Sequence, residues 1–390
     1  MAHISLLVSD LSGGGAVRAY LLAQVLQRLD HQPKVVGFQY GPDLYAQPPN
    51  DIPVKAVPGK PYPQFFSAVR QLWPHLEGQI LYAIKPKPSS FGVALWRRLW
   101  QRRRTRQPVL LDMDDWELSW HGGDAWRYRP TLKQFYRDLC KPGGQLRDPD
   151  HPLYVKWLEG WVKSADGLTV DTTFLQHRFG GAYLPNGKDT QLFAPTPYDP
   201  EVCRRKYGLS DCRVLMFPGA PRPHKGVEDV LAALAQLDDP QYRLVIVGGS
   251  PYDDYDARLR DRWGRWLIQL PRCPVATMPE ILAAAHVVVV PQRQTPTAVA
   301  QFPLKLTDGM AMGKPVLSTT VGDIPEILAD TGYLVPPGDV GAIAAQLTHM
   351  FANWESAQKR GLAARQRCIQ YYSVEEMAIT LARLLAPFLS

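Results

Sequence analysis

The feature that most constrains the fold is an alternation of short apolar runs with helical patterns, which begins at the N-terminus of the 390-residue chain. Residues 3–9 (HISLLVS) are an apolar run, Gly13, Gly14 and Gly15 form a turn, and apolar residues then recur at helical spacing from Ala19 to Leu29. A strand, a glycine turn and a helix in this order are typical of the first unit of a parallel α/β domain. Further strands are predicted at residues 34–38, 79–84, 109–113 and 167–170. The first half therefore predicts an open, Rossmann-like sheet.

A second α/β series follows a linker at residues 185–200 (PNGKDTQLFAPTPYDP), whose proline and polar turn residues are typical of segments between compact units. Strands are predicted at residues 213–217, 243–247, 287–290 and 315–318, and helices at residues 227–237, 279–285 and 304–312. The fold class is therefore α/β, and two similar halves in tandem are expected to have a cleft between them.

The chain is longer than one hydrophobic core usually supports, which agrees with two domains. We place the N-terminal domain at residues 1–195 and the C-terminal domain at residues 196–373. A final amphipathic pattern runs from Val374 to Leu385, and Pro387 is expected to end that helix. This C-terminal segment, residues 374–390, is expected to pack back on the N-terminal domain.

Charge and cysteine content indicate which kinds of partner and which cellular compartment to expect. The net charge of +7 and the isoelectric point near 9.1 favour anionic partners such as phosphates, nucleic acids or acidic lipid surfaces. The five cysteines are scattered without any metal-binding spacing, which predicts a reducing compartment and no structural zinc. The N-terminus lacks the features of a signal peptide, and no apolar run approaches the ~20 residues that span a bilayer. We therefore expect a cytoplasmic location and leave open a peripheral one at the inner face of a membrane.

The strongest candidate for an anion site is Phe217 to Gly226 (FPGAPRPHKG), between a predicted strand and the helix predicted at residues 227–237. Amide groups at a helix N-terminus and the helix dipole attract anions, and Arg222 and Lys225 add two cationic donors. This loop suits a diphosphate. The alternative is a surface turn that its prolines stiffen, with solvated charges.

A second candidate is Gln301 to Val316 (QFPLKLTDGMAMGKPV), where a loop opens a predicted helix that ends at Gly313. Lys305 lies in the first turn of that helix, and Asp308 follows one turn later on the same face. A carboxylate at this place can accept hydrogen bonds from two ribose hydroxyls. The alternative is an exposed Lys–Asp pair at helical spacing.

Four segments together resemble the retaining glycosyltransferase family 4: PNGKDTQLF from Pro185, GAPRPHKG from Gly219, LVIVGG from Leu244 and FPLKLTDGMAMGKPVLSTTVGDIPEIL from Phe302. Their order and spacing match the family over nearly the whole second half, and GGGAVR from Gly13 matches more loosely. The resemblance implies the GT-B fold, with a nucleotide-diphosphate sugar on the C-terminal domain and the acceptor on the N-terminal one. It implies transfer to a hydroxyl of a glycan or lipid-linked acceptor, with retention of configuration and without a metal or other cofactor.

The same resemblance assigns roles to residues of this chain. Lys225 would neutralise the leaving diphosphate, Asp308 would hold the ribose, and the turn from Gly13 to Gly15 would reach the distal phosphate. The leaving phosphate is thought to assist the incoming hydroxyl on the same face of the sugar, so no protein nucleophile is implied. The other implied donor contacts are Gly219, Met278, Phe302, Pro303, Leu304 and Lys305.

Three positions depart from the family pattern. Ala300 and Asp308 stand where the family commonly has two glutamates, and Ala220 stands where it commonly has an arginine. Arg222 is then the nearby candidate for a phosphate contact. The missing glutamate keeps open a GT-B pseudoenzyme that binds a nucleotide sugar, or scaffolds a pathway, without transferring the sugar.

A third candidate is Leu111 to His121 (LDMDDWELSWH), which follows the strand predicted at residues 109–113. Carboxylates at the C-terminal ends of such strands lie where open α/β sheets bind ligands. Asp114 is therefore expected to accept hydrogen bonds from hydroxyls of the acceptor. His121 stands roughly where many family members carry a histidine near the transferred sugar. An ordinary polar loop is the alternative, and adjacent Asp114 and Asp115 are only weak support for a Mg²⁺ site. The predicted catalytic residues are Lys225, Arg222, His121 and Asp114.

A basic segment lies between Glu77 and Asp112, where the chain has eight Lys or Arg residues and no acid. Most of them fall within Trp96 to Arg106 (WRRLWQRRRTR). Tryptophans beside arginines suit an anionic membrane surface, where the rings lie at headgroup depth. The alternative is a solvated basic helix with its tryptophans in the core.

Two rivals from other classes fit the residues less well. A dinucleotide-dependent oxidoreductase would need Gly-x-Gly-x-x-Gly and an acid after the next strand, but the chain has three consecutive glycines and Gly37-Phe38-Gln39-Tyr40 there. A nucleic-acid-binding protein would use the arginines to contact phosphates. The sequence contains no recognisable nucleic-acid-binding module, so no nucleic-acid partner is expected.

Overall fold

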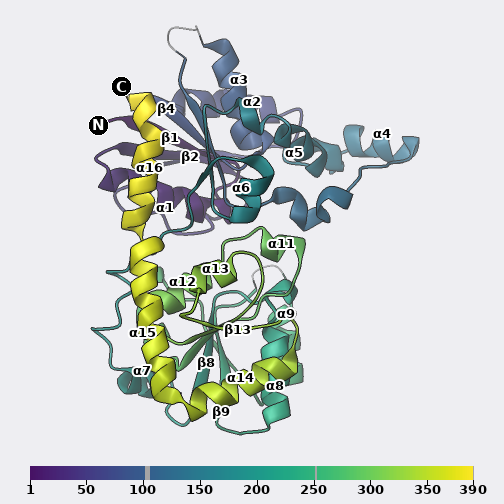
Figure 1. The fold of residues 1–390 in the computed structure, drawn as a ribbon. Coiled ribbons are helices and arrows are strands. Elements are labelled where there is room, and N and C mark those ends of the chain that lie inside the picture. Colours follow the sequence, from purple (N-terminus) through teal and green to yellow (C-terminus); the bar gives the residue numbers. More distant parts are fainter. Residues whose placement is uncertain (102–105, 251–252, 390) are drawn as a thin grey trace. The chain divides into compact units, whose positions relative to one another are not determined.

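The computed structural model describes residues 1–101, 106–250 and 253–389, which form two compact units (Figure 1). Unit 1 consists of Met1–Asn186, Ala300–Phe302 and Met377–Ser390, and unit 2 consists of Gly187–Val299 and Pro303–Glu376. The first division lies at Asn186, inside the predicted linker of residues 185–200.

Unit 1 is built on a seven-stranded parallel sheet with the strand order β3-β2-β1-β4-β5-β6-β7. The register places Leu6 of β1 beside Val35 of β2 and Tyr82 of β4. Five of these strands were predicted, whereas β3, partly exposed at the sheet edge, and β7, two residues long, carry no clear apolar run. The strands are β1 (His3–Val8), β2 (Gln32–Gln39), β3 (Val54–Pro58), β4 (Ile80–Ile84), β5 (Val109–Met113), β6 (Gly167–Val170) and β7 (Ala182–Tyr183).

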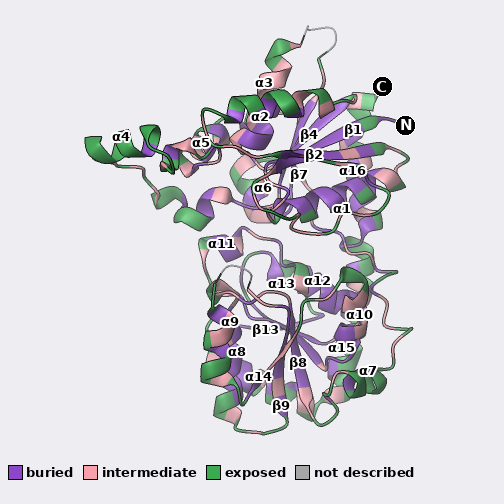
Figure 2. Ribbon diagram, turned by 180° about the vertical axis from the view of Figure 1, so that it is seen from behind, coloured by how far each residue is buried: buried purple, intermediate pink, exposed green. Residues whose placement is uncertain are grey.

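The strands at the centre of this sheet are covered on both faces. Every residue of β4 and β5 is buried, and Figure 2 shows the sheet in the colour of buried residues. Continuous burial is expected of a parallel sheet packed between helices. The helices of unit 1 are α1 (Gly15–Arg28), α2 (Phe65–Leu72), α3 (Val93–Trp100), α4 (Leu132–Cys140), α5 (Pro152–Glu159) and α6 (Thr173–Phe179).

The final helix, α16 (Val374–Leu389), ends later than the sequence predicted. Pro387 lies inside it and does not stop it, so the prediction that this proline ends the helix was wrong. A proline costs one backbone hydrogen bond, but Leu381 and Leu385 are fully buried, and Phe388 lies beside Gly167 of β6. This packing within unit 1 holds the last turn.

Unit 2 is built on a six-stranded parallel sheet with the order β10-β9-β8-β11-β12-β13. Its strands are β8 (Arg213–Pro218), β9 (Tyr242–Val247), β10 (Leu267–Leu270), β11 (Val287–Val290), β12 (Val316–Thr319) and β13 (Tyr333–Val335). The two edge strands, β10 and β13, were not predicted. The helices are α7 (Pro200–Lys206), α8 (Val227–Leu237), α9 (Tyr255–Trp263), α10 (Met278–Ala283), α11 (Pro296–Val299), α12 (Leu304–Ala311), α13 (Ile324–Leu328), α14 (Val340–Ala352) and α15 (Trp354–Tyr371).

Each sheet has one place where the strand order reverses. In unit 1 this place lies between β1 and β4, and in unit 2 it lies between β8 and β11. Open α/β sheets bind ligands outside the carboxyl ends of the strands at such a reversal. The loops that follow β1, β4, β8 and β11 are therefore the first places to look for a site.

Candidate functional site

The loop after β8 is held at the strand reversal of unit 2 by its glycines. Gly219 has φ +124° and Gly226 has φ +69°, values that side chains other than hydrogen rarely allow. A Cβ on Gly226 would lie 1.8 Å from the carbonyl oxygen of Pro291, just after β11, so only glycine fits. The short 3₁₀ turn Pro223–Lys225 between them leads directly into α8. Arg222 and Lys225 are thereby fixed at the carboxyl end of β8.

Lys305, in the first turn of α12, reaches the same loop. Its Nζ lies 5.0 Å from the centroid of the Phe217 ring, and a Cβ on Gly219 would lie 3.1 Å from its Cε. Gly219 therefore leaves the room that this side chain occupies. Burial and the neighbouring Arg222 lower the pKa of Lys305 below its ordinary value, although Asp308 acts in the opposite direction.

His224 reports the electrostatic character of this cluster. Burial lowers its pKa to about 3, and Lys225, Arg222 and Lys305 each add to the effect. The imidazole is therefore neutral at physiological pH, and the surrounding potential is positive. The structure brings together three of the predicted cationic residues, and such a cluster at the start of a helix suits an anion with more than one charge.

Asp308 forms an ion pair that the sequence did not predict. Its carboxylate is buried on α12 and contacts the ammonium of Lys188, which lies 3.6 Å from the centroid of the Phe193 ring. The backbone of Lys188 is fixed too, since its N–H donates to the carbonyl of Tyr372 at 2.7 Å. Lys188 belongs to PNGKDTQLF, which was quoted for the resemblance and given no role there.

The other predicted donor contacts lie on several elements. Met278 begins α10, Leu304 begins α12 with an exposed side chain, and Pro303 is the buried residue before it. Phe302 is buried and counts with unit 1. Ala300, where the resembled family commonly has glutamate, is fully buried in the apolar core of unit 1.

The glycine turn of unit 1 follows β1 and opens α1. A Cβ on Gly13 would lie 3.3 Å from a carboxylate oxygen of Asp10, and one on Gly15 would lie 3.5 Å from Cε of Lys85. A Cβ on Gly14 would meet nothing within 4 Å, so the backbone there faces open space. An accessible backbone at the start of a 14-residue helix is suited to an anionic or polar ligand.

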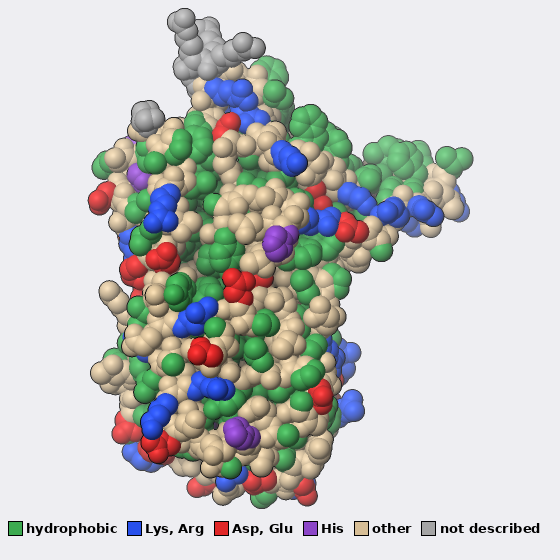
Figure 3. Space-filling model, viewed as in Figure 1, with side chains coloured by type: hydrophobic (Ala, Val, Ile, Leu, Met, Phe, Trp, Pro, Cys, Tyr) green, Lys and Arg blue, Asp and Glu red, His purple; other side chains and the backbone are tan. Residues whose placement is uncertain are grey.

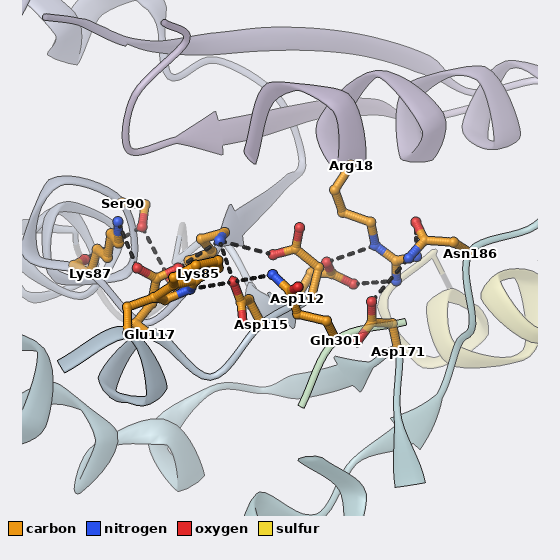
Figure 4. A network of polar contacts seen from close by, with 12 residues as sticks. Arg18, Lys85, Lys87, Ser90, Asp112, Asp115, Glu117, Asp171, Asn186 and Gln301 are labelled. Atoms are coloured by element: carbon orange, nitrogen blue, oxygen red, sulfur yellow. Dashed lines mark hydrogen bonds and ion pairs between the residues drawn. The ribbon is translucent and has the colours of Figure 1, made fainter. Parts of the chain in front are cut away.

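Lys85, just after β4, is the centre of an acidic cluster with Asp115 and Glu117 (Figure 4). The predicted Asp114 also belongs to this cluster. Its Nζ lies 2.5 Å from Oε1 of Glu117, 3.6 Å from Oδ1 of Asp114 and 3.8 Å from Oδ2 of Asp115. Lys87 adds a contact of 2.8 Å to Oε2 of Glu117. These side chains are largely buried at the carboxyl ends of β4 and β5, next to the glycine turn.

The cluster separates the pKa values of its carboxyl groups. Burial raises the pKa of Asp115 to about 6, although Lys85 opposes the shift. Burial acts on Glu117 in the same direction, but Lys85 and Lys87 outweigh it and lower its pKa to about 2. Oδ2 of Asp115 also accepts hydrogen bonds from Trp120 at 2.8 Å and from Gln301 at 3.1 Å. Asp115 thus changes protonation at a higher pH than Glu117 does.

Arg18 of α1 forms hydrogen bonds with residues from several parts of unit 1, and it was not predicted from the sequence. The fully buried guanidinium donates to both carboxylate oxygens of Asp112, to the carbonyl of Leu184 and to the side chain of Asn186. Asn186 in turn donates to Oδ2 of Asp171, just after β6. A signal was present, because Arg18 lies four residues before Leu22 and therefore on the apolar face of α1.

His121 lines a pocket of about 540 Å³ with His151, Arg129 and Arg137 among its other residues. Burial lowers the pKa of His121 below its ordinary value. His121 therefore belongs to this pocket, whereas Asp114 belongs to the Lys85 cluster.

The basic segment Trp96 to Arg106 is only partly described, and Arg102, Arg103 and Arg104 lie outside the described residues. Trp96 packs edge-on against Trp73, with ring centroids 5.6 Å apart, and Arg98 donates to the carbonyl of Ser164. None of the described helices combines the length and apolar composition needed to cross a membrane. Contact of this segment with a membrane surface stays a prediction.

In the described part of the chain, no group of three or more His, Cys, Asp or Glu side chains is arranged to hold a metal ion. Arg222, Lys225 and Lys305 place positive charge near the predicted donor loop.

Parts of the chain match known proteins in sequence. Residues 212–353 match the family model described as "Glycosyl transferases group 1". A GDP-mannose-dependent α-(1-6)-phosphatidylinositol monomannoside mannosyltransferase of Mycolicibacterium smegmatis is 29% identical over 238 residues, 57% of this chain and 62% of the relative. O-antigen chain mannosyltransferase B of Escherichia coli is 30% identical over 179 residues, 43% of this chain and 46% of the relative. The chain thus spans less than two thirds of the length of these relatives.

Solved structures match the whole chain in fold. Sucrose-phosphate synthase from Thermosynechococcus elongatus has a TM-score of 0.72 at 19% identity and covers 100% of this chain and 99% of its own. Anabaena Alr3699/HepE in complex with UDP-glucose has a TM-score of 0.73 at 18% identity and covers 99% of this chain and 100% of its own. At this identity the likeness shows the fold, and the predicted GT-B class with two Rossmann-like domains is confirmed.

Proposed function

Because this chain carries a glycosyl transferases group 1 domain at residues 212–353, we propose that it transfers a sugar from a nucleotide-diphosphate sugar to an acceptor hydroxyl. The observation that carries the proposal is the convergence of Arg222, Lys225 and Lys305 on the loop after β8. Fixed cations of this kind stabilise negative charge that develops on a leaving group. The diphosphate of the donor is the anion that fits them.

In the proposed reaction, the bond between the anomeric carbon and the diphosphate oxygen breaks while the acceptor oxygen bonds to the same carbon. The acceptor oxygen attacks from the same face that the diphosphate leaves, so the configuration is retained and no protein nucleophile is needed. The acceptor proton goes to the leaving diphosphate. Lys225 and Arg222 neutralise the leaving group, and Asp308, which Lys188 holds in place, accepts the ribose hydroxyls. Within unit 2, Gly219, Met278 and the segment from Pro303 to Lys305 complete the donor site.

For the acceptor we propose unit 1. The open backbone at Gly14 suits a polar group, and Oδ1 of Asp114 is buried without a hydrogen bond in the structure. A glycan hydroxyl could donate to that oxygen, with His121 contributing from the pocket that it lines. A lipid-linked acceptor is consistent with the name of the M. smegmatis relative, which acts on a phosphatidylinositol monomannoside.

The direct experiment is a thermal shift with UDP, GDP, ADP, TDP and CMP, since a ligand at a hundred times its Kd adds ~2.7 kcal/mol of stability. GDP and UDP lead the panel because one relative uses GDP-mannose and one structural neighbour binds UDP-glucose. One nucleoside diphosphate should raise the melting temperature by several degrees. If none does, the proposed donor site is wrong.

A second candidate function is nucleotide-sugar binding without transfer. Ala300 favours it, because a fully buried alanine stands where the resembled family commonly has a glutamate. The matching nucleotide sugar separates the two candidates. Release of nucleoside diphosphate, with or without an added acceptor, supports the transferase, and binding without any turnover supports the pseudoenzyme.

A further inference from the structure

Helix α4 of unit 1 turns its apolar side toward solvent. Leu132, Phe135, Tyr136 and Leu139 recur at the spacing that forms one stripe along a helix, and 91%, 45%, 59% and 48% of their surfaces are exposed. The buried residue of this helix is an acid, Asp138. A helix that packs on its own domain has the opposite arrangement, so the apolar stripe serves something other than the core of unit 1.

Polar contacts, not the stripe, hold α4 in place. Thr131 and Gln134 form a reciprocal capping box at its start. Asp138 accepts a hydrogen bond from the Tyr128 hydroxyl at 2.9 Å and another from Nε of Arg137 at 3.1 Å. The helix is therefore ordered while its apolar side remains uncovered.

The charge around the stripe is mostly positive. Residues 125–147 contain six Lys or Arg and one acid, the buried Asp138. In Figure 3, hydrophobic side chains lie along one edge of the projecting segment that carries α4, and Lys and Arg side chains lie along the other. The exposed basic residues are Arg127, Arg129, Lys133, Arg137 and Lys141.

We infer that α4 docks this chain on an anionic lipid bilayer. Apolar side chains along one stripe and basic side chains beside it are the combination that places a helix at a lipid interface. Leu132, Phe135, Tyr136 and Leu139 enter the layer between headgroups and acyl chains, and the flanking Lys and Arg side chains contact lipid phosphates. The inference goes beyond sugar transfer and does not depend on it.

A second copy of the chain fits this surface poorly. Two stripes that met face to face would bring Lys133, Arg137 and Lys141 of both copies together, with no exposed acid in residues 125–147 to pair with them. A nine-residue helix is also only about 14 Å long, too short to bury the ~1,200 Å² that stable interfaces need. A bilayer satisfies both the apolar stripe and the positive charge.

The test is sedimentation of the full chain with vesicles of phosphatidylcholine and phosphatidylglycerol in equal parts, compared with vesicles of phosphatidylcholine alone. The chain should bind the anionic vesicles, and added salt should weaken binding. Leu132→Ser/Leu139→Ser should reduce the partition coefficient about tenfold or more, as should Lys133→Gln/Lys141→Gln. The matched control is Leu362→Ser/Ile369→Ser, which removes two exposed apolar side chains of α15 and should change nothing.

Cys140, exposed at the end of α4, allows a second readout that a general loss of stability would not imitate. An environment-sensitive fluorophore attached there, in a Cys212→Ser/Cys273→Ser background, should shift to the blue with anionic vesicles. Absence of vesicle binding, equal binding of the α4 variants, or an unshifted probe would overturn the inference. So would a lipid-free dimer that Leu132→Ser/Leu139→Ser abolishes, measured by sedimentation velocity.

Discussion

The guanidinium of Arg18 and the carboxylate of Asp112 form a buried two-pronged ion pair, with Nε to Oδ2 at 2.9 Å and Nη2 to Oδ1 at 2.8 Å. The pair joins α1, which begins at the glycine turn, to β5, which leads into the acidic cluster. It therefore fixes two parts of the proposed acceptor site relative to each other inside unit 1.

Removal of one partner should reveal how much this pair matters. Arg18→Met leaves the Asp112 carboxylate buried without its cation, which should lower the free energy of unfolding by about 3–5 kcal/mol in urea titrations. Arg18→Met/Asp112→Leu removes both charges and should recover a large part of that loss. Arg265→Met, in the exposed pair with Asp238, is the control and should change little. A similar loss in the control would show that the assay reports substitution of any arginine.

The sequence predicted those parts of the fold that local pattern determines. Strands such as β1 and β11 are continuous apolar runs buried on both faces, so their composition alone indicates them. The edge strands β10 and β13 are short, and their burial is incomplete, so their residues differ little from a loop. Pro387 misled the prediction because tertiary packing outweighed a local helix-breaking preference.

The residues of the candidate site also differ in how far the sequence alone could predict them. Arg222 and Lys225 were predictable because a loop that opens a helix is visible in consecutive residues. The partners of Arg18 and Asp308 were not, since Asp112 and Lys188 are distant in the chain and only folding brings them close. Lys85 was likewise hidden, because its three acidic neighbours come from the loop after another strand.

Lys225 should matter for turnover more than for folding. If it stabilises charge on the leaving diphosphate, Lys225→Ala should lower kcat by roughly two to three orders of magnitude, the scale for losing one preorganised contact to developing charge. Its melting temperature should stay near that of the wild type. Lys359→Ala, at an exposed lysine of α15, is the matched control. A folded Lys225→Ala protein with wild-type turnover would remove this residue from the mechanism.

Asp115 should give the stability a defined pH dependence. Its pKa is raised to about 6, so the folded chain holds this proton more tightly than the unfolded chain does. Asp115→Asn should therefore stabilise the chain above pH ~6, by up to about 3 kcal/mol, and the gain should disappear as the pH falls toward ~4. Urea titrations of both proteins across this range measure the difference, and Asp261→Asn is the exposed control. A difference that is constant with pH would contradict the prediction.

Substitution of Glu117 should change the stability in the opposite direction to substitution of Asp115. Lys85 and Lys87 lower its pKa to about 2, so its ionised form stabilises the fold above the unfolded pKa near ~4.3. Glu117→Gln should destabilise the chain at neutral pH, and the loss should shrink as the pH falls from ~4.3 toward 2. The same titrations at lower pH test this. A loss that persists at pH ~2 would mean that the glutamine disturbs packing and not charge.

The last prediction concerns Asp308 and the ribose. If its carboxylate accepts hydrogen bonds from the ribose hydroxyls, Asp308→Asn should weaken binding of the matching nucleoside diphosphate by ~1.5–3 kcal/mol, the range for bonds to a charged group. A 2′,3′-dideoxyribose analogue should bind the wild type poorly and lose little further affinity in the variant. Calorimetric titration of both ligands against both proteins measures this interaction, and a value near zero would exclude the contact.

The ion pair with Lys188 supplies the control for that experiment. Asp308→Asn also leaves the Lys188 ammonium without its carboxylate, and this change alone could distort the site. Lys188→Met/Asp308→Asn removes the uncompensated charge together with the carboxylate. If the ribose hydroxyls bind Asp308 directly, the double variant should bind the nucleotide as weakly as Asp308→Asn does. If its affinity returns to that of the wild type, the loss came from the stranded lysine, and Asp308 serves the fold of unit 2 and not the donor.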